Sequence, residues 1–146
     1  MSYWRLFYHF VWTTKNREPL LTPDIELRVH GFLRNEADTK LHAPLCFVNG
    51  MPDHIHVLAS VRPAVSPADF VKPLKGASSR WISLEFKRAF EWQEGYGVLS
   101  VSEENAQRVL EYIKHQKQHH AAKTRIMELE MTQDREGTRW IDSEIF

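Results

Sequence analysis

The chain has 146 residues, of which 42% are hydrophobic and 26% charged, and its 19 Lys and Arg balance 19 Asp and Glu. These proportions are ordinary for a globular protein, and no low-complexity or repeated stretch interrupts them. A net charge of zero gives no global attraction to nucleic acid, so binding of nucleic acid would have to rest on a local patch.

We predict one domain over residues 1–146, because this length supports one hydrophobic core and no linker-like segment divides it. The only cysteine, Cys46, has apolar neighbours and is predicted to be a buried strand thiol. No stretch reaches the roughly 18 uncharged apolar residues of a membrane helix, and the N-terminus lacks a signal-peptide cleavage site. The sequence therefore predicts a cytoplasmic protein with no membrane role.

The first part of the chain alternates strand-like and helix-like patterns. Residues 6–14 are aromatic and β-branched, which predicts a strand. A Thr-Pro-Asp start followed by apolar residues at helical spacing predicts a helix over about residues 24–38. Residues 44–48 and 54–61 then resemble the two strands of a hairpin, with a turn predicted at residues 49–50 (Asn-Gly).

The second part of the chain completes the pattern. Residues 66–69 (Ser-Pro-Ala-Asp) open a second helix, and residues 95–102 have the composition of a fourth strand. Ser102, followed by two glutamates, caps a last helix that we expect to continue to about residue 120. The order βαββαβα predicts an α+β fold of the ferredoxin-like (RRM-like) type. Two helices would cover one face of an antiparallel four-stranded sheet, and the last helix could lie across the other face.

Two histidines stand two positions apart on the strand predicted at residues 54–61. Side chains alternate along a strand, so His54 and His56 point to one face while Ile55 and Val57 point to the core. Neutral imidazoles are good ligands for divalent metals, and such a pair could share one ion. Two polar side chains on the solvent side of a half-exposed strand are the alternative, and a short motif alone does not decide between them.

The last helix carries a second candidate group. Its predicted buried stripe consists of Ala106, Val109, Leu110 and Ile113. Tyr112 and Gln116 lie on a neighbouring stripe, one turn apart, so they point the same way. Turned toward the histidine strand, they could supply a nucleophile and a third metal ligand. The alternative is a half-buried tyrosine at the core edge beside a surface glutamine.

Basic and aromatic side chains provide the candidates for contacts with nucleic acid. Residues 1–90 hold 12 Lys and Arg against 8 Asp and Glu, whereas residues 91–146 hold 7 against 11. The candidates for phosphate contacts are Lys15, Arg17, Lys72, Lys75 and Arg80, although a solvated surface explains each of them equally well. Trp92 could stack on a base but fits better as a loop anchor, and Tyr96 is a rival nucleophile that we interpret as strand packing.

Four motifs, in this order within residues 6–120, resemble the HUH-type single-tyrosine transposases of the small insertion-sequence class, which are related to the REP-associated tyrosine transposases. They are His9 to Arg17 (HFVWTTKNR), Met51 to Val57 (MPDHIHV), Leu74 to Gly76 (LKG) and Tyr112 to Gln116 (YIKHQ). Glutamine four residues after the tyrosine favours the insertion-sequence branch. Residues 121–146 match no continuation of that family, which leaves competence for transposition open.

The resemblance implies roles for four residues. His54, His56 and Gln116 would hold Mg²⁺ or Mn²⁺, and Tyr112 would attack DNA to form a 5′-phosphotyrosine link. It also implies a homodimer that binds single-stranded DNA hairpins at the ends of the element. Three alternatives remain: a domesticated hairpin-binding protein without transposition, an RNA-binding module that uses its aromatic sheet face, and a metal-dependent hydrolase with water as nucleophile.

Overall fold

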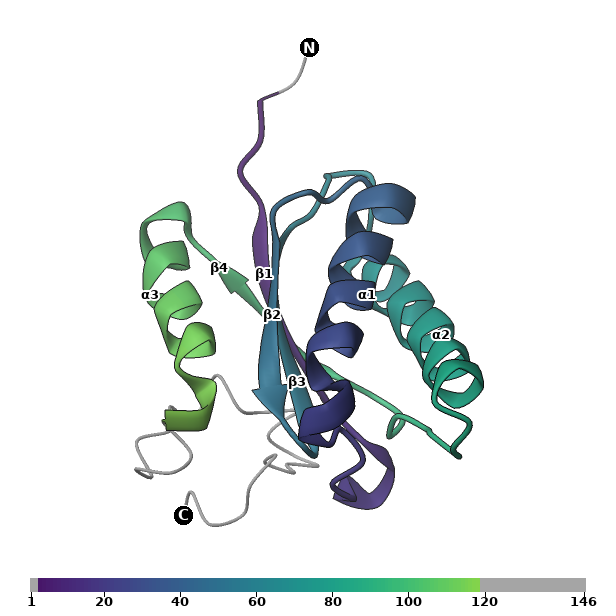
Figure 1. The fold of residues 1–146 in the computed structure, drawn as a ribbon. Coiled ribbons are helices and arrows are strands. Elements are labelled where there is room, and N and C mark those ends of the chain that lie inside the picture. Colours follow the sequence, from purple (N-terminus) through teal and green to yellow (C-terminus); the bar gives the residue numbers. More distant parts are fainter. Residues whose placement is uncertain (1–2, 119–146) are drawn as a thin grey trace.

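A four-stranded antiparallel sheet forms the centre of the structure, a computed structural model that describes residues 3–118 (Figure 1). The strands are β1 (Phe7–Thr13), β2 (Cys46–Met51), β3 (His54–Ser60) and β4 (Gly97–Val101). Their order across the sheet is β2-β3-β1-β4, and β1 pairs antiparallel with both β3 and β4. This strand order confirms the ferredoxin-like arrangement.

Helices cover both faces of the sheet (Figure 1). On one face, α1 (Pro23–Leu41) packs on α2 (Pro67–Glu85) through the rings of Phe32 and Trp81, whose centroids are 4.5 Å apart. On the other face, α3 (Glu103–Lys114) lies against β1, β2 and β3. The predicted α+β class, with an extra C-terminal helix that carries the tyrosine, is confirmed.

Local sequence explains where α2 and α3 begin. Ser66 and Ser102 have extended backbones and act as N-caps, with hydroxyls that accept hydrogen bonds from the backbone N–H of Asp69 (3.0 Å) and Asn105 (3.2 Å). Each cap satisfies an N–H that has no partner inside the helix. The acidic residues in the first turns also complement the positive end of the helix dipole.

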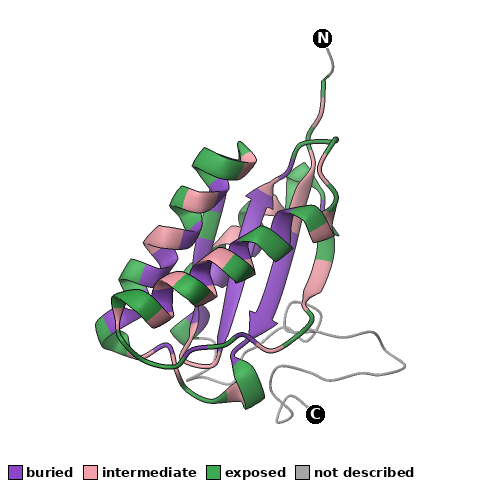
Figure 2. Ribbon diagram, turned by 90° about the vertical axis from the view of Figure 1, so that its right-hand side faces the viewer, coloured by how far each residue is buried: buried purple, intermediate pink, exposed green. Residues whose placement is uncertain are grey.

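The two faces of the sheet contribute to different cores. Phe10, Trp12 and Ile55 are fully buried in the larger core beneath α1 and α2. Leu58 instead belongs to a smaller cluster with residues of α3. Because both faces are covered, consecutive residues of β3 are buried from His54 onward, and the central strands are drawn as buried in Figure 2.

The turn between β2 and β3 lies later in the chain than predicted. Asn49 and Gly50 belong to β2, and Pro52 with Asp53 makes the turn. A Cβ atom at position 50 would lie 2.2 Å from the carbonyl oxygen of His54, so glycine is required there by close backbone approach inside the strand pair. The turn predicted from the Asn-Gly pair was wrong, because this glycine allows the backbones of β2 and β3 to approach closely and does not form a turn.

Cys46 is buried on β2, and burial raises the pKa of its thiol to about 12. The prediction of a buried strand thiol is confirmed, and because the thiolate is the reactive form, this raised pKa disfavours reactivity. Within residues 3–118, no helix combines the length and apolar character needed to cross a membrane.

His30 on α1 predicts how stability depends on pH. Its side chain is buried, and burial together with the charges of Lys117 and Arg34 lowers its pKa to about 4. In the unfolded chain the imidazole of His30 is protonated near pH 6.5, whereas in the folded chain it is protonated only near pH 4. The free energy of unfolding is therefore not reduced by His30 above pH 6.5. As pH falls from 6.5 toward 4, protonation of His30 in the unfolded chain lowers it by up to about 3 kcal/mol.

Urea unfolding at pH 7.5 and pH 5 measures this effect. We expect His30→Leu to lose about 2 kcal/mol less stability between the two pH values than the wild-type chain, because the variant lacks the buried imidazole whose protonation opposes folding. Equal losses in the two proteins would show that His30 does not carry the dependence.

Candidate active site

The two histidines of β3 lie between the sheet and α3. His54 is 1% exposed and His56 is fully buried, and their ring centroids are 5.1 Å apart. The prediction that both rings share one face is confirmed. The alternative, in which they lie on a solvent face, is wrong because α3 covers that side of the sheet.

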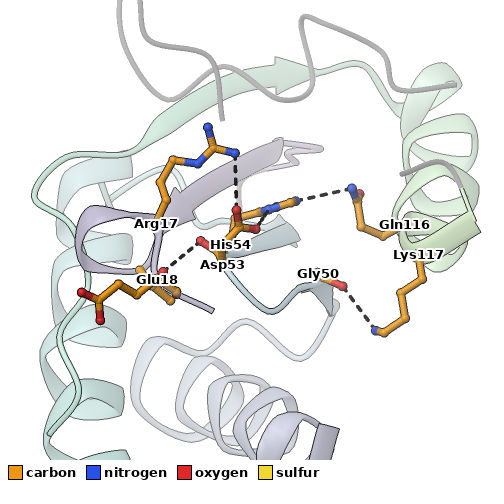
Figure 3. A network of polar contacts seen from close by, with 8 residues as sticks. Arg17, Glu18, Gly50, Asp53, His54, Gln116 and Lys117 are labelled. Carbon is orange, nitrogen blue, oxygen red and sulfur yellow. Dashed lines mark hydrogen bonds and ion pairs between the residues drawn. The ribbon is translucent and has the colours of Figure 1, made fainter. Parts of the chain in front are cut away.

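A carboxylate fixes the orientation of His54. The Oδ1 atom of Asp53 lies 2.7 Å from Nδ1 of His54, and its Oδ2 atom lies 3.3 Å from the guanidinium of Arg17 (Figure 3). Burial raises the pKa of Asp53, but the hydrogen bond from His54, together with the charge of Arg17, outweighs it, so the pKa is lowered. The carboxylate accepts the Nδ1 proton, and Nε2 of His54 keeps its lone pair.

That lone pair is directed at Gln116. The side-chain nitrogen of Gln116 lies 3.5 Å from Nε2 of His54, and Gln116 is completely buried (Figure 3). An amide can present its nitrogen or its oxygen by turning about one bond, since the two ends have the same shape. Because Gln116 is buried, the alternative of a surface glutamine is wrong. Its position beside His54 matches the geometry expected from the sequence.

The chain reaches Gln116 through a break in the helix. We predicted one helix to about residue 120, but α3 ends at Lys114, and His115 has non-helical dihedral angles (φ −103°, ψ 25°) before residues 116–118 become helical again. Residues 119–120 lie outside the described part of the chain. The side chain of Asn49 donates to the carbonyl oxygen of Ile113 (2.9 Å), which holds this last turn against β2.

A second contact holds the residue after Gln116. The ammonium of Lys117 pairs with Glu26, a buried residue of α1. It also lies 3.3 Å from the carbonyl oxygen of Gly50 (Figure 3). Lys117 thus links the end of the tyrosine helix to both β2 and α1. With Asn49, it fixes the position from which Gln116 faces His54.

Tyr112 lies deeper than its place in the helical pattern predicted. It is 3% exposed and packs in the smaller core with Leu58, Val101, Val109 and Ile113. Its ring centroid is 6.1 Å from that of His56, at an angle of 73°. The prediction that Tyr112 lies outside the buried stripe was wrong, because a helix lying on a sheet buries an arc wide enough to include the neighbouring position.

Sequence reasoning did not identify His9 as a site residue. His9 lies on β1 with 1% exposure, and its Nε2 atom is 2.8 Å from Nδ1 of His56. The two ring planes differ by only 5°. Alternation along β1 could have placed His9 on the correct face, but its contact with His56 depends on the register between strands.

The donor set fits a divalent metal ion. Within residues 3–118, no three His, Cys, Asp or Glu side chains are arranged to hold a metal, so His54 and His56 would need the amide of Gln116 as a third ligand. Adjacent ligands of Mg²⁺ are roughly 3 Å apart, given bond lengths of about 2.1 Å and octahedral angles. The 3.5 Å between His54 and Gln116 is close to that spacing.

The predicted phosphate-contacting residues fall into two groups. Lys15 and Arg17 lie in the 3₁₀ turn Lys15–Arg17 directly after β1, whose last residue pairs with His54, so they lie at the same end of the sheet as the histidines. Lys72, Lys75 and Arg80 belong to α2, on the opposite side of the sheet.

The three residues of α2 differ in their freedom to bind DNA. Lys72 and Arg80 are exposed. Lys75 donates to the carbonyl oxygens of Gln93 and Gly95, each at 2.7 Å, and burial lowers its pKa to about 8. Lys75 therefore holds the segment before β4 in place through these hydrogen bonds. The structure does not bring Lys72, Lys75 and Arg80 close to the histidine pair.

Two aromatic candidates have packing roles. Trp92 is buried, and its indole N–H donates to the hydroxyl of Ser78 at 2.9 Å, which leaves no face for a base. Tyr96 packs against Phe10, with ring centroids 6.4 Å apart, beneath the helices of the other layer. Both interpretations as packing residues agree with the structure.

Comparison with known proteins places this arrangement in a family. The model of the family described as "Transposase IS200 like" matches residues 2–116. The ISDra2 transposase TnpA of Deinococcus radiodurans is 32% identical over 120 residues, 77% of this chain and 85% of the relative. The transposase for insertion sequence element IS200 of Salmonella typhimurium is 34% identical over 125 residues, 77% of this chain and 78% of the relative.

Solved structures show the same fold. A crystal structure of a transposase from Deinococcus radiodurans superposes with a TM-score of 0.64 at 33% identity, over 79% of this chain and 93% of that one. A REP-associated tyrosine transposase bound to a REP hairpin superposes with a TM-score of 0.53 at 15% identity, over 82% of this chain and 74% of that one. At this lower identity the second structure supports the fold alone.

Proposed function

The chain belongs to the IS200-like family of single-tyrosine transposases, which are DNA strand transferases, and we propose that it cuts and rejoins single-stranded DNA with Tyr112 as the nucleophile. The observation that carries this proposal is the meeting of Tyr112, His54, His56 and Gln116 in one buried space between α3 and β3. No other tyrosine of residues 3–118 lies beside paired histidines.

The reaction conserves phosphodiester bonds. The phenolic oxygen of Tyr112 forms a bond to phosphorus, and the 3′ oxygen of the preceding nucleotide leaves with the bonding pair and takes a proton. The products are a 5′-phosphotyrosine link and a free 3′-hydroxyl. A 3′-hydroxyl from another strand can then attack the link and release Tyr112, so joining needs no nucleotide cofactor.

Tyr112 needs activation and access. A phenol has an ordinary pKa of about 10, so at neutral pH it is a weak nucleophile until its proton is removed or its target is polarised. A divalent metal held by His54, His56 and Gln116 would supply that polarisation when bound. Since Tyr112 is 3% exposed, the proposal requires that DNA binding uncovers its hydroxyl.

We extend the proposal to the metal, the DNA and the quaternary state. Imidazole ligands favour Mn²⁺ or another transition metal over Mg²⁺, although either ion would serve the chemistry. Lys15 and Arg17, at the site's end of the sheet, are the proposed phosphate contacts, and Lys72 and Arg80 would contact a separate DNA segment. We propose a hairpin substrate and a homodimer as expectations from the family, and the REP-associated relative of the same fold is itself bound to a REP hairpin.

Three observations weigh against the other classes of function. An RNA-binding module of this fold would stack bases on its open sheet face, but α3 covers that face here. Tyr8, Phe10 and Trp12 of β1 alternate with the site residues and pack toward the larger core. A hydrolase with water as nucleophile would not require the tyrosine that the structure places against His56.

The test is formation of a covalent adduct. The protein is incubated with labelled single-stranded hairpins from the flanks of its own gene, with Mn²⁺, with Mg²⁺ or with chelator, and resolved on a denaturing gel. We expect a metal-dependent protein–DNA band and, when a second strand with a 3′-hydroxyl is added, a joined product. Hairpin binding without any adduct would instead identify a domesticated binding protein.

A further inference from the structure

His9 is a buried titratable residue that the proposed reaction does not use. It stands on β1 opposite Leu58, and its side chain reaches diagonally across the strand pair to His56. The 2.8 Å distance between Nε2 of His9 and Nδ1 of His56 is that of a hydrogen bond, and the 5° between the ring planes lets the lone pair of one nitrogen meet the N–H of the other.

Only one proton arrangement of this pair suits a metal site. If His9 donated from Nε2, Nδ1 of His56 would be the acceptor and the proton of neutral His56 would occupy Nε2. If His56 donates from Nδ1, its Nε2 keeps a lone pair on the far side of the ring. A histidine that binds a metal through one nitrogen donates its other ring N–H to a neighbouring acceptor in the same way.

We propose that His9 is a positioning residue that accepts the Nδ1 proton of His56 and so presents Nε2 of His56 as a metal ligand. It would do for His56 what Asp53 does for His54. The inference rests on the proposed metal site. The arrangement gives two histidines of β3 separate second partners, a carboxylate from the turn and an imidazole from the neighbouring strand.

Three variants separate this role from simple core packing. His9→Leu keeps an apolar side chain of similar size but removes the acceptor. His9→Gln restores an acceptor oxygen at about the same reach. Val11→Ala, on the same strand and directly paired with His56, removes buried volume without touching its ring nitrogens.

The first readout needs no metal. Nitrogen–proton correlation spectra of the imidazoles at pH 7.5 should show His56 protonated at Nδ1 in the wild-type chain, in His9→Gln and in Val11→Ala. In His9→Leu, the proton should move to Nε2 in a substantial fraction of molecules. His56 protonated at Nε2 in the wild-type chain would overturn the proposal.

The second readout is Mn²⁺ affinity, measured from the electron paramagnetic resonance signal of free Mn²⁺. We expect His9→Leu to raise the dissociation constant about 10- to 100-fold, and His9→Gln to restore it to within about threefold of wild type. Equal affinity of His9→Leu and wild type, or an equal loss in Val11→Ala, would overturn the role of His9 alone. Wild-type binding that is absent, or insensitive to His54→Ala, would overturn the metal site and this proposal together.

Discussion

Tyr112→Phe is expected to abolish the covalent protein–DNA adduct while leaving the fold and hairpin binding in place. Phenylalanine keeps the ring that packs with Leu58 and Val109 in the smaller core, so only the hydroxyl is lost. Loss of one buried hydroxyl costs about 1 kcal/mol of stability. Loss of a nucleophile that no other group replaces lowers the rate of cleavage by at least about three orders of magnitude.

The matched control is Tyr96→Phe, which removes a hydroxyl from a tyrosine that packs against Phe10 on the other side of the sheet. We expect this variant to form the adduct at the wild-type rate, as measured by the labelled band on a denaturing gel. Adduct formation by Tyr112→Phe, or its loss in Tyr96→Phe, would show that Tyr112 is not the nucleophile. Hairpin binding by both variants in a gel-shift assay shows that the DNA surface is intact.

Local periodicity explains the part of the fold and site that could be predicted. The alternation in β3 directs His54 and His56 to one face whatever the partner strands are, because the repeat of two is a property of the strand itself. The cap at Ser102 similarly marks the start of α3 from the sequence alone. The order of elements then limited the topology to a ferredoxin-like sheet.

Contacts between distant segments explain what the sequence did not reveal. His9 meets His56 across 47 positions of sequence, and that contact depends on strand register. The helix ends at Lys114, where Asn49 of β2 donates to its last carbonyl groups, and a helical pattern in the sequence contains no information about such a partner. Asn49 and Gly50 were assigned to a turn, although Asn49 binds the end of α3 and Gly50 permits close approach of β2 to β3.

The same limit applies to the basic residues. Lysine and arginine side chains that look equivalent in sequence differ in the structure, since Lys75 is held by two backbone carbonyl groups while Lys15 is exposed near the site. A count of charges cannot distinguish such side chains, because it does not show which are buried or how far each lies from the histidine pair. Their assignment required the position of α2 on the far side of the sheet.

His54→Ala is expected to remove measurable metal binding and, with it, the metal-dependent adduct. Loss of one of three protein ligands should raise the Mn²⁺ dissociation constant by more than about 100-fold, a larger effect than loss of a residue that only orients a ligand. Titration calorimetry of the metal-free protein measures this change, and thermal unfolding in chelator shows whether the variant remains folded. Unchanged affinity with lost cleavage would assign His54 a role other than ligation.

Gln116 permits a sharper comparison, because its neutral amide can be exchanged for a better ligand or for none. Gln116→Glu places a carboxylate where the amide lies 3.5 Å from Nε2 of His54, and Gln116→Leu places an apolar group of similar size there. A third ligand predicts tighter Mn²⁺ binding in the glutamate variant and weaker binding in the leucine variant, by about 10-fold or more in each direction. If Gln116 only packed in the core, the buried glutamate would destabilise the fold more than leucine would. Mn²⁺ affinity would then not be higher in the glutamate variant than in the leucine variant. The order of the two variants in Mn²⁺ affinity therefore distinguishes a metal ligand from a packing residue, and the measurement needs no DNA.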